Sequence, residues 1–495
     1  MSEKSGQKFR QDEHIVENIE LSIWEALIPV IALIGMLAYN VYVFGDDAIS
    51  GSNQFILLMG GAVAAIVGFY NKVSFKQMLA EVAENVKSTT GAILILLMVG
   101  ALAGTWLISG IIPAMIYYGL QVLNPTIFLG ACVIISAIIS IATGSSWTTS
   151  ATVGIALVGI GEALGISLGM TAGAILSGAY FGDKMSPLSD TTNLAPAMAG
   201  GELFSHIRYM SMTTIPTILI TLLVFVILGF TIETNGNADT KGIMASIEEV
   251  FNISGWLFIV PLVVILMIIR KTPPLVALLI GTLLGGVFAL IFQPEVVAGI
   301  TGSRTLGFES GYKGILNAIT VNTSIETDNP ALNALFEAKG MKGMLGTIWL
   351  IVCAMVFGGV MDGIGALSRI TRSLLSMAKS TLSLFASTVG SCLALNITAS
   401  DQYLAIVVPG KMFAQAYEDR GLAPENLSRT LEDSGTVTSV LIPWNTCGAY
   451  HSGVLGVPVA DYFFYAIFNW MSPMMTLFFA AVGIKIKQLV KLSLI

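Results

Sequence analysis

The sequence predicts an all-α polytopic membrane protein made of two inverted-topology repeats with broken or re-entrant helices, in about 10–13 membrane segments. Composition is the first reason. Of 495 residues, 55% are hydrophobic and only 11% are charged, whereas a soluble domain carries roughly 25% charged residues. The second reason is a series of apolar stretches, several of which reach the roughly 20 residues that a helix needs to cross a bilayer. The third is a polar pattern that recurs in the second half of the chain.

The apolar runs predict the membrane segments in chain order. They lie near residues 22–44, 54–70, 91–109, 126–143, 150–182, 210–231, 254–270, 273–292, 345–361, 381–397, 402–417, 436–450 and 462–484. Residues 74–90 differ, because apolar side chains such as Met78 and Val82 recur at helical spacing with charged ones between them. This pattern predicts an amphipathic helix at the membrane interface.

Basic residues in short loops favour the cytoplasmic side of a membrane. On this rule the cytoplasmic segments are those with Lys4, Lys8 and Arg10, with Lys72, Lys76 and Lys87, with Arg270 and Lys271, with Arg369, Arg372 and Lys379, and with Lys485, Lys487 and Lys491. The acidic segments predicted outside are those with Asp46 and Asp47 and with Glu233 and Asp239. Both termini are therefore expected in the cytoplasm, and no removable signal peptide is expected.

These signals divide the chain into five parts. They are a cytoplasmic N-terminal tail (1–20), a first transmembrane repeat (21–231), an external linker with a short amphipathic segment (232–253), a second transmembrane repeat (254–484, with a polar external insertion at about 293–344) and a cytoplasmic tail (485–495).

Two short patterns support the repeat. Thr143-Gly-Ser-Ser146 matches Thr398-Ala-Ser-Asp401, and Phe181-Gly-Asp183 matches Leu431-Glu-Asp433. Because the first half starts inside and the second outside, the repeat is predicted to be inverted, as in many secondary transporters. The alternative is chance recurrence, since Gly, Ser and Thr are common packing residues in membrane helices.

Ionisable side chains at bilayer depth cost on the order of 2.5–3.5 kcal/mol each on insertion scales, so they mark functional sites. The window from Ser177 to Asn193 mixes carboxylates, hydroxyls and an amide with the helix breakers Gly and Pro. Such oxygen ligands suit a hard cation such as sodium. The candidate ion-binding residues in or near this window are Ser145, Asp183, Ser186, Asp190, Thr191, Thr192 and Asn193. The alternative is that Lys184 pairs with a nearby Asp in an interfacial loop.

The window from Leu427 to His451 repeats this order, with acidic residues first and then Pro with Asn and Thr. Its candidate ion-binding residues, together with one at an earlier helix break, are Asp401, Asp433, Ser434, Thr436, Asn445 and Thr446. A desolvated carboxylate binds either a cation or a proton, so the candidates for proton coupling are Asp183, Glu432 and Asp433. Lys411 and His451 are candidate accessory charges. The alternatives are that Lys411 snorkels to the interface and that His451 is a hydrogen-bonded structural residue.

Several function classes lack support. The net charge of −7 argues against a nucleic-acid partner. There is no Walker A or H-E-x-x-H match and no nucleophile and base pair, so neither an enzyme nor a cofactor is expected. The four cysteines lack C-x-x-C spacing and are predicted to be buried packing residues.

The run Gly178 to Asn193, with Thr143 to Thr149 upstream and Leu431 to Thr436 and Ile442 to Thr446 downstream, resembles the NhaC-type sodium/proton antiporters of the ion-transporter superfamily. The likeness covers roughly residues 22–484. It implies a prokaryotic inner-membrane exchanger with inverted repeats and broken helices, often a homodimer formed through scaffold helices. The same family includes relatives similar to sodium/malate-lactate antiporters. The candidate ligands above come from side-chain chemistry and happen to lie in the family's motifs.

The leading functional hypothesis is exchange of sodium, or lithium, for protons by alternating access, with the lipid bilayer as the surrounding partner. The second is a sodium-coupled carboxylate exchanger. In that case helix N-termini opened at Pro187 and Pro443 would bind the organic anion, with Lys411, Arg429 or His451 as counter-charge. The scarcity of buried Arg disfavours this second reading. The third, an intramembrane enzyme or receptor, has no catalytic pair or soluble sensor domain to support it.

Overall fold

The computed structural model describes residues 15–44, 51–231, 240–327, 333 and 336–489. Within them, eight helices are long and apolar enough to cross a membrane, or nine if one bent pair is counted as a span. The eight are α1 (Ile23–Phe44), α2 (Ser52–Tyr70), α4 (Thr90–Ile108), α6 (Pro125–Thr143), α11 (Leu203–Thr231), α14 (Pro274–Phe292), α19 (Leu345–Gly363, continuous with α18) and α21 (Thr381–Thr398). The prediction of an all-α polytopic membrane protein is confirmed.

Shorter helices fill the space between these spans. They are α3 (Phe75–Ser88), α5 (Ile111–Val122), α7 (Ser146–Thr149), η2 (Ser150–Gly154), α8 (Ile155–Ala163), α9 (Leu168–Met185), α10 (Asp190–Ala199), α12 (Thr240–Val250), η3 (Gly255–Phe258), α13 (Ile259–Ile269), α15 (Pro294–Ile300), α16 (Phe308–Thr320), α18 (Gly340–Gly343), α20 (Ala366–Ser376), α22 (Gln402–Asp419), α23 (Pro424–Leu431), η4 (Glu432–Thr436), η5 (Ser439–Leu441), α24 (Thr446–Leu455), α25 (Val459–Tyr462) and α26 (Ile467–Val482). A two-residue antiparallel pair, β1 (Thr323–Ser324) and β2 (Glu337–Ala338), joins Thr323 to Ala338.

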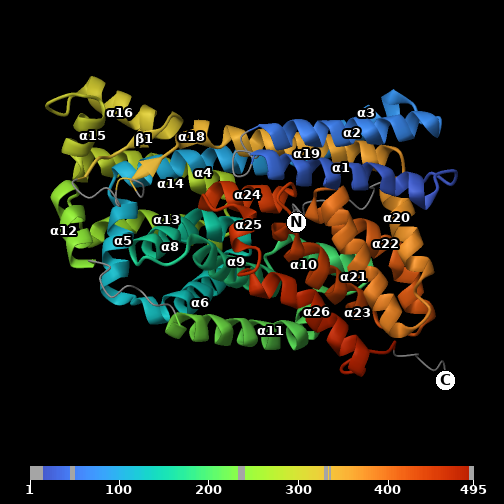
Figure 1. Cartoon of the computed structure of the whole chain (residues 1–495). Coiled ribbons are helices and arrows are strands. Elements are labelled where there is room, and N and C mark those ends of the chain that lie inside the picture. The colour runs from blue at the N-terminus through green and yellow to red at the C-terminus, as the bar shows by residue number, and fades with distance from the viewer. Residues whose placement is uncertain (1–14, 45–50, 232–239, 328–332, 334–335, 490–495) are drawn as a thin grey trace, which may run out of the picture.

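In Figure 1 the helices α1, α2 and α19 form one side of the bundle, and α6 and α11 lie on the opposite side. The helices α9, α10 and α24 lie between these two sides. Several apolar runs are therefore not single spans. In the run at 150–182, for example, Gly165 adopts a left-handed conformation (φ 71°) and turns the chain between α8 and α9.

The amphipathic segment is helical as predicted, and it packs along α19. A Cβ added to Gly359 of α19 would lie 2.5 Å from the Val82 Cα, and one added to Gly363 would lie 2.9 Å from the Met78 Cα. These two contacts are four residues apart on both helices, so α3 packs lengthwise along a spanning helix instead of lying across the ends of the spans. The apolar side of α3 packs against Gly359 and Gly363 of α19.

Helix α9 packs against α6 at backbone distance. A Cβ on Gly178 would lie 2.2 Å from the Val133 carbonyl oxygen, and one on Gly182 would lie 2.5 Å from that of Ala137. The Ser140 hydroxyl donates to the Ala179 carbonyl oxygen at 2.6 Å. Small residues at this spacing allow such close approach in membrane helices. The contact fixes the position of the acidic end of α9.

Gly178→Ala is expected to lower the free energy of unfolding by about 1–3 kcal/mol, because the added methyl group overpacks the α6–α9 contact. Thermal unfolding of the purified protein in detergent measures this effect. The matched control is Gly91→Ala in α4, where nothing lies within 4 Å of the added carbon. Equal melting temperatures for the two variants would contradict the predicted contact.

The helix breaks of the two halves share one geometry. Gly144 (φ 71°) and Ser400 (φ 59°) are left-handed, and each precedes an extended N-cap residue, Ser145 for α7 and Asp401 for α22. Gly144 and Ser400 are 256 residues apart, and so are the caps Ser145 and Asp401. The same spacing separates the caps Ser189 of α10 and Asn445 of α24. The pattern match therefore needs a shift of one residue, and Asp183 and Asp433 do not occupy equivalent positions.

The two halves run in opposite directions. Helix α6 starts at the C-terminal end of α11, where a Cβ on Gly229 would lie 2.0 Å from the Thr126 carbonyl oxygen. Helix α21 starts just after Ala378, whose carbonyl oxygen accepts a hydrogen bond from Arg420. Glu425, five residues after Arg420, accepts a hydrogen bond from the Ser205 hydroxyl in the first turn of α11. The equivalent helices α6 and α21 therefore start at opposite ends of α11.

Two of the basic segments predicted to be cytoplasmic, those with Arg372 and with Lys487, lie at one end of the bundle. Asn18 donates to the carbonyl oxygen of Ile364, where α19 ends, and Arg372 of α20 pairs with Glu17 at 2.7 Å. Helix α20 leads to Ala378 and thus to the end that carries Glu425 and its partner Lys487. Some residues behind the orientation prediction lie outside the described part of the chain: Lys4, Lys8, Arg10, Asp46, Asp47, Glu233, Asp239 and Lys491.

Candidate ion-binding site

Asp433 is the centre of the buried polar cluster. It lies in η4, a π-helical turn, and its carboxylate pairs with Lys184 of α9; both side chains are 0% exposed. Its Oδ2 accepts hydrogen bonds from Thr213 of α11, at 3.0 Å, and from Thr476 of α26. Ser472 of α26 accepts from the Lys184 ammonium at 3.0 Å and donates weakly to Asp433 Oδ1 at 3.4 Å. This carboxylate therefore joins groups from both repeats.

Asp183 lies next to Lys184 in the sequence but faces the first helix break. Its Oδ2 accepts from the Ser146 hydroxyl at 2.7 Å and from the Ser146 backbone N–H at 3.1 Å. Ser145, one of the predicted ligands, accepts from the Thr148 N–H and so caps α7. Backbone that is not helical is tolerated at membrane depth only where it is buried in protein or lines a cavity.

Helix α10 connects the two acidic segments. Thr191 donates to Glu432 Oε1 at 2.9 Å, and the Thr192 hydroxyl donates to the carbonyl oxygens of Asp183 and Lys184 at 3.3 and 3.2 Å. Glu432 is fully buried. Asp183, Glu432, Asp433, Thr191 and Thr192 thus lie in one connected group.

A second set of contacts ties the later helix break to η4. Asn445 caps α24 by accepting from the Cys447 N–H at 3.0 Å, and it donates to Asn396 Oδ1 at 3.1 Å. Asn396 in turn donates to the Gly435 carbonyl oxygen at 2.8 Å. The Thr446 N–H donates to the Ser400 carbonyl oxygen at 2.9 Å. Both breaks of the second repeat are therefore fastened to the turn that carries Asp433.

The other predicted residues lie around this group. Ser186 donates to the Ile141 carbonyl oxygen, Asn193 donates to those of Pro187 and Ser189, and Asp401 caps α22. Ser434 and Thr436 are buried in η4, and the Ser434 hydroxyl has no hydrogen-bond partner among the described residues. Asp190 is exposed at the start of α10, and Lys411 is half-buried on α22. His451 is buried away from the carboxylates and bonds Ser150 at 2.9 Å.

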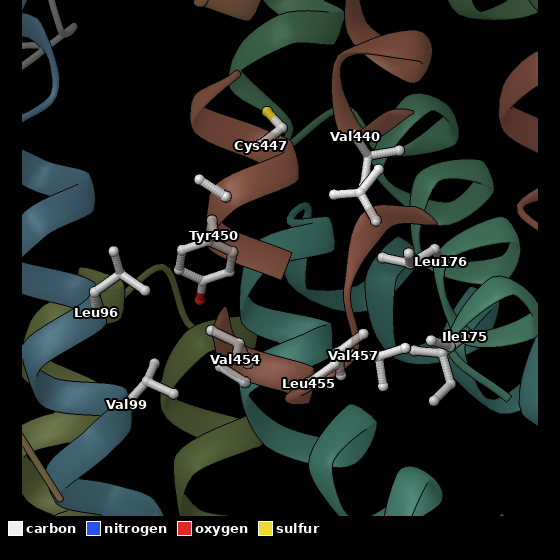
Figure 2. Close-up of a cluster of buried hydrophobic side chains, with 14 of the residues drawn as sticks. Leu96, Val99, Ile175, Leu176, Val440, Cys447, Tyr450, Val454, Leu455 and Val457 are labelled. Carbon is white, nitrogen blue, oxygen red and sulfur yellow. The ribbon is translucent and has the colours of Figure 1, made fainter. Parts of the chain in front are cut away.

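Apolar side chains surround the later break. Figure 2 shows Val454, Leu455 and Tyr450 of α24 between Leu96 and Val99 of α4 on one side and Ile175 and Leu176 of α9 on the other. Cys447 lies in this layer, and all four cysteines are buried and unpaired, as predicted. In such dry surroundings an electrostatic interaction is stronger than in water.

The sequence did not predict the three hydroxyl groups that hydrogen-bond Asp433. It also placed the ammonium partner of Asp433 elsewhere. Lys184 was weighed only as an interfacial residue, and its partner is 249 residues away. Thr213, Ser472 and Thr476 lie in apolar runs. Ser472 and Thr476 are four residues apart and so share one helix face, but this spacing alone does not mark a binding site in a membrane helix.

Comparison with known proteins shows the family. The sequence model of the Na+/H+ antiporter family matches residues 178–484. The chain belongs to this family. It is 36% identical over 425 residues to the Na(+)/H(+) antiporter NhaC of Alkalihalophilus pseudofirmus, a match that covers 85% of this chain and 88% of that protein. The predicted resemblance is confirmed, and the chain is a transporter and not an enzyme.

Other relatives in the comparison carry different cargo names. The malate-2H(+)/Na(+)-lactate antiporter of Bacillus subtilis is 34% identical, over 95% of each chain. The arginine/ornithine antiporter ArcD of Halobacterium salinarum is 33% identical, over 94% of this chain and 93% of that protein. Proteins similar to this chain therefore include ones named for organic cargo, and the cargo of this chain has to be argued from its site.

Proposed function

We propose that this antiporter exchanges sodium, and also lithium, for protons across a prokaryotic cytoplasmic membrane by alternating access. The observation that carries the proposal is the fully buried Asp433, which is bonded by side chains from both repeats. Asp183 and Glu432 lie in the same polar group. Both termini are expected in the cytoplasm, because basic residues in short loops favour that side, and a homodimer stays a prediction.

Charge balance supports a cation as cargo. Around η4 and the helices that pack against it, the described residues bury the carboxylates of Asp183, Asp401, Glu425, Glu432 and Asp433 and the cations of Lys184 and Arg429. Lys487 neutralises Glu425, so four acids remain against two bases. An unneutralised charge is costly in apolar surroundings, so the remaining negative charge favours either a bound sodium ion or a bound proton. Alternation between these two occupants is exchange.

The Lys184 ammonium acts as a tethered cation in this scheme. It neutralises Asp433 when the site holds no sodium, and sodium competes with it for the same carboxylate oxygens. The hydroxyls of Thr213, Ser472 and Thr476 supply further oxygen ligands, which suit a hard cation. Alternating access would use the helix breaks and the π-helical turn, since such irregular turns are frequent at functional sites.

The test is ion replacement in proteoliposomes with a pH-sensitive dye inside. Addition of sodium or lithium is expected to move protons in the opposite direction, whereas potassium or choline is expected to have no effect. Proton movement that is equal with choline and with sodium would overturn the proposal.

A second candidate function rests on Arg429. Its guanidinium is fully buried and lies 4.6 Å over the Tyr209 ring, and none of its three nitrogens has a hydrogen-bond partner in the described part of the chain. A buried guanidinium suits a carboxylate, as in a sodium-coupled carboxylate exchanger. Uptake of radiolabelled malate or lactate that requires sodium, and that Arg429→Gln removes, would favour this candidate over proton exchange alone.

A further inference from the structure

A groove lies at the basic end of the bundle, outside the ion site. It has a volume of about 350 Å³ and is lined by Arg208, Tyr209 and Met212 of α11 and by Lys485, Ile486 and Lys487 of the C-terminal segment. Its walls are thus a membrane-spanning helix and the chain that follows α26. The lining combines positive charge with apolar surface.

The C-terminal wall of the groove is fastened to the protein. The Tyr209 hydroxyl donates to the Lys485 carbonyl oxygen at 2.5 Å, and the Lys487 ammonium pairs with Glu425 at 2.6 Å. The Ala423 N–H donates to the Lys487 carbonyl oxygen at 2.9 Å. The charge of Lys487 is therefore neutralised, and the groove keeps a fixed shape.

Two positive charges at the groove remain without a carboxylate partner among the described residues. Arg208 and Lys485 are both exposed, and each lines the groove. Two cations held beside an open cavity at a membrane protein's basic end attract an anion. Charge complementarity alone would suit either free phosphate or the headgroup of an acidic lipid.

The surface of α11 decides between these sources. Arg208, Met212, Ile215 and Leu219 are spaced by four, three and four residues, so they share one face of the helix. Ile215 is 47% and Leu219 is 59% exposed. From Arg208 to Leu219 this face extends about 16 Å, at 1.5 Å per residue. An apolar strip that begins at a cationic groove matches an acyl chain attached to an anionic headgroup. Free phosphate has no apolar part that could contact this strip.

We propose that this groove binds an acidic glycerophospholipid of the leaflet that faces the basic end. The phosphate contacts Arg208 and Lys485, and an acyl chain lies along Met212, Ile215 and Leu219. Basic pockets beside membrane helices bind such headgroups in general. The bound lipid joins α11 to the C-terminal segment.

The groove is connected to the ion site through α23. The Tyr209 hydroxyl donates to Asn426 of α23 at 2.5 Å, and Asn426 donates to the Lys487 carbonyl oxygen at 2.7 Å. Helix α23 continues directly into η4, which carries Glu432 and Asp433. The lipid is therefore expected to stabilise the folded protein at the segment that leads to the carboxylates. Lipid binding itself does not depend on which cargo is exchanged.

The experiment measures binding to the purified full chain in neutral detergent. Phosphatidylglycerol is expected to raise the melting temperature and to remain bound in native mass spectrometry, and phosphatidylcholine is not. The double variant Arg208→Gln/Lys485→Gln is expected to weaken phosphatidylglycerol binding at least tenfold. Ile215→Asn is expected to weaken it as well while leaving the cations in place.

The matched control is Arg304→Gln/Lys313→Gln, which removes two exposed positive charges near α15 and α16 at the other end of the bundle (Figure 1). This control is expected to bind phosphatidylglycerol like the unchanged protein. Three results would overturn the proposal: full binding by Arg208→Gln/Lys485→Gln, equal loss in the control, or equal protection by inorganic phosphate. The last would identify a free-anion site.

Discussion

Asp433→Asn is expected to abolish sodium-dependent proton movement. The carboxylate pairs with the Lys184 ammonium and accepts hydrogen bonds from Thr213 and Thr476. Asparagine removes its charge without changing its size. The neutral side chain neither holds sodium as a counter-charge nor alternates between a cation and a proton. Breaking a buried ion pair at one partner costs about 3–5 kcal/mol, so the melting temperature is expected to fall as well. The measurement is sodium-induced proton flux in proteoliposomes.

A double variant separates transport from stability. Lys184→Met together with Asp433→Asn removes both charges, and replacing a buried pair by uncharged groups of similar volume is often neutral for stability. The double variant is therefore expected to unfold at a higher temperature than Asp433→Asn alone and still to exchange no sodium. If Asp433→Asn itself exchanges sodium at the normal rate, Asp433 is not the carrier of the cargo charge.

Asp183→Asn is expected to remove exchange with a smaller loss of stability. The two hydrogen bonds that Ser146 donates to the side chain end on one oxygen. The amide oxygen of asparagine accepts the same two bonds, so the first helix break keeps its geometry while the charge is lost. Flux and melting temperature of one protein preparation measure the two effects.

The matched control for Asp183 is Glu418→Gln, which neutralises an exposed acid on α22. It is expected to leave both the sodium flux and the melting temperature unchanged. A flux loss in Glu418→Gln as large as that in Asp183→Asn would mean that overall charge, and not the buried position, determines the effect.

The spans and breaks were predictable because they follow from composition and from local residue preferences. Apolar length identified the spanning helices, and Gly144 fits the left-handed turn that it forms. The residue-by-residue alignment of the two repeats was not predictable from the amino-acid sequence alone. The matched pattern paired Ser146 with Asp401, whereas the backbone pairs the caps Ser145 and Asp401. The π-helical turn at Asp433 carries no sequence signature either, because it depends on contacts with other helices.

The acidic part of the site was predictable, since a carboxylate in an apolar run is conspicuous and costly. The hydroxyl groups that hydrogen-bond Asp433 were not predictable. Thr217 and Thr221 of α11 simply donate to carbonyl oxygens four residues earlier in their own helix, so a threonine in a span is no signal of a ligand. Only the fold shows that Thr213, one turn before Thr217, also donates to a carboxylate.

The most direct test of Asp183 and Asp433 as the shared carriers of sodium and protons is proton release on sodium binding. The purified protein in weakly buffered detergent is titrated with sodium, and the pH is recorded. The unchanged protein is expected to release protons in proportion to the sodium bound, and Asp183→Asn and Asp433→Asn are expected to release none. Undiminished proton release from both variants, or sodium binding without any release from the unchanged protein, would contradict this role.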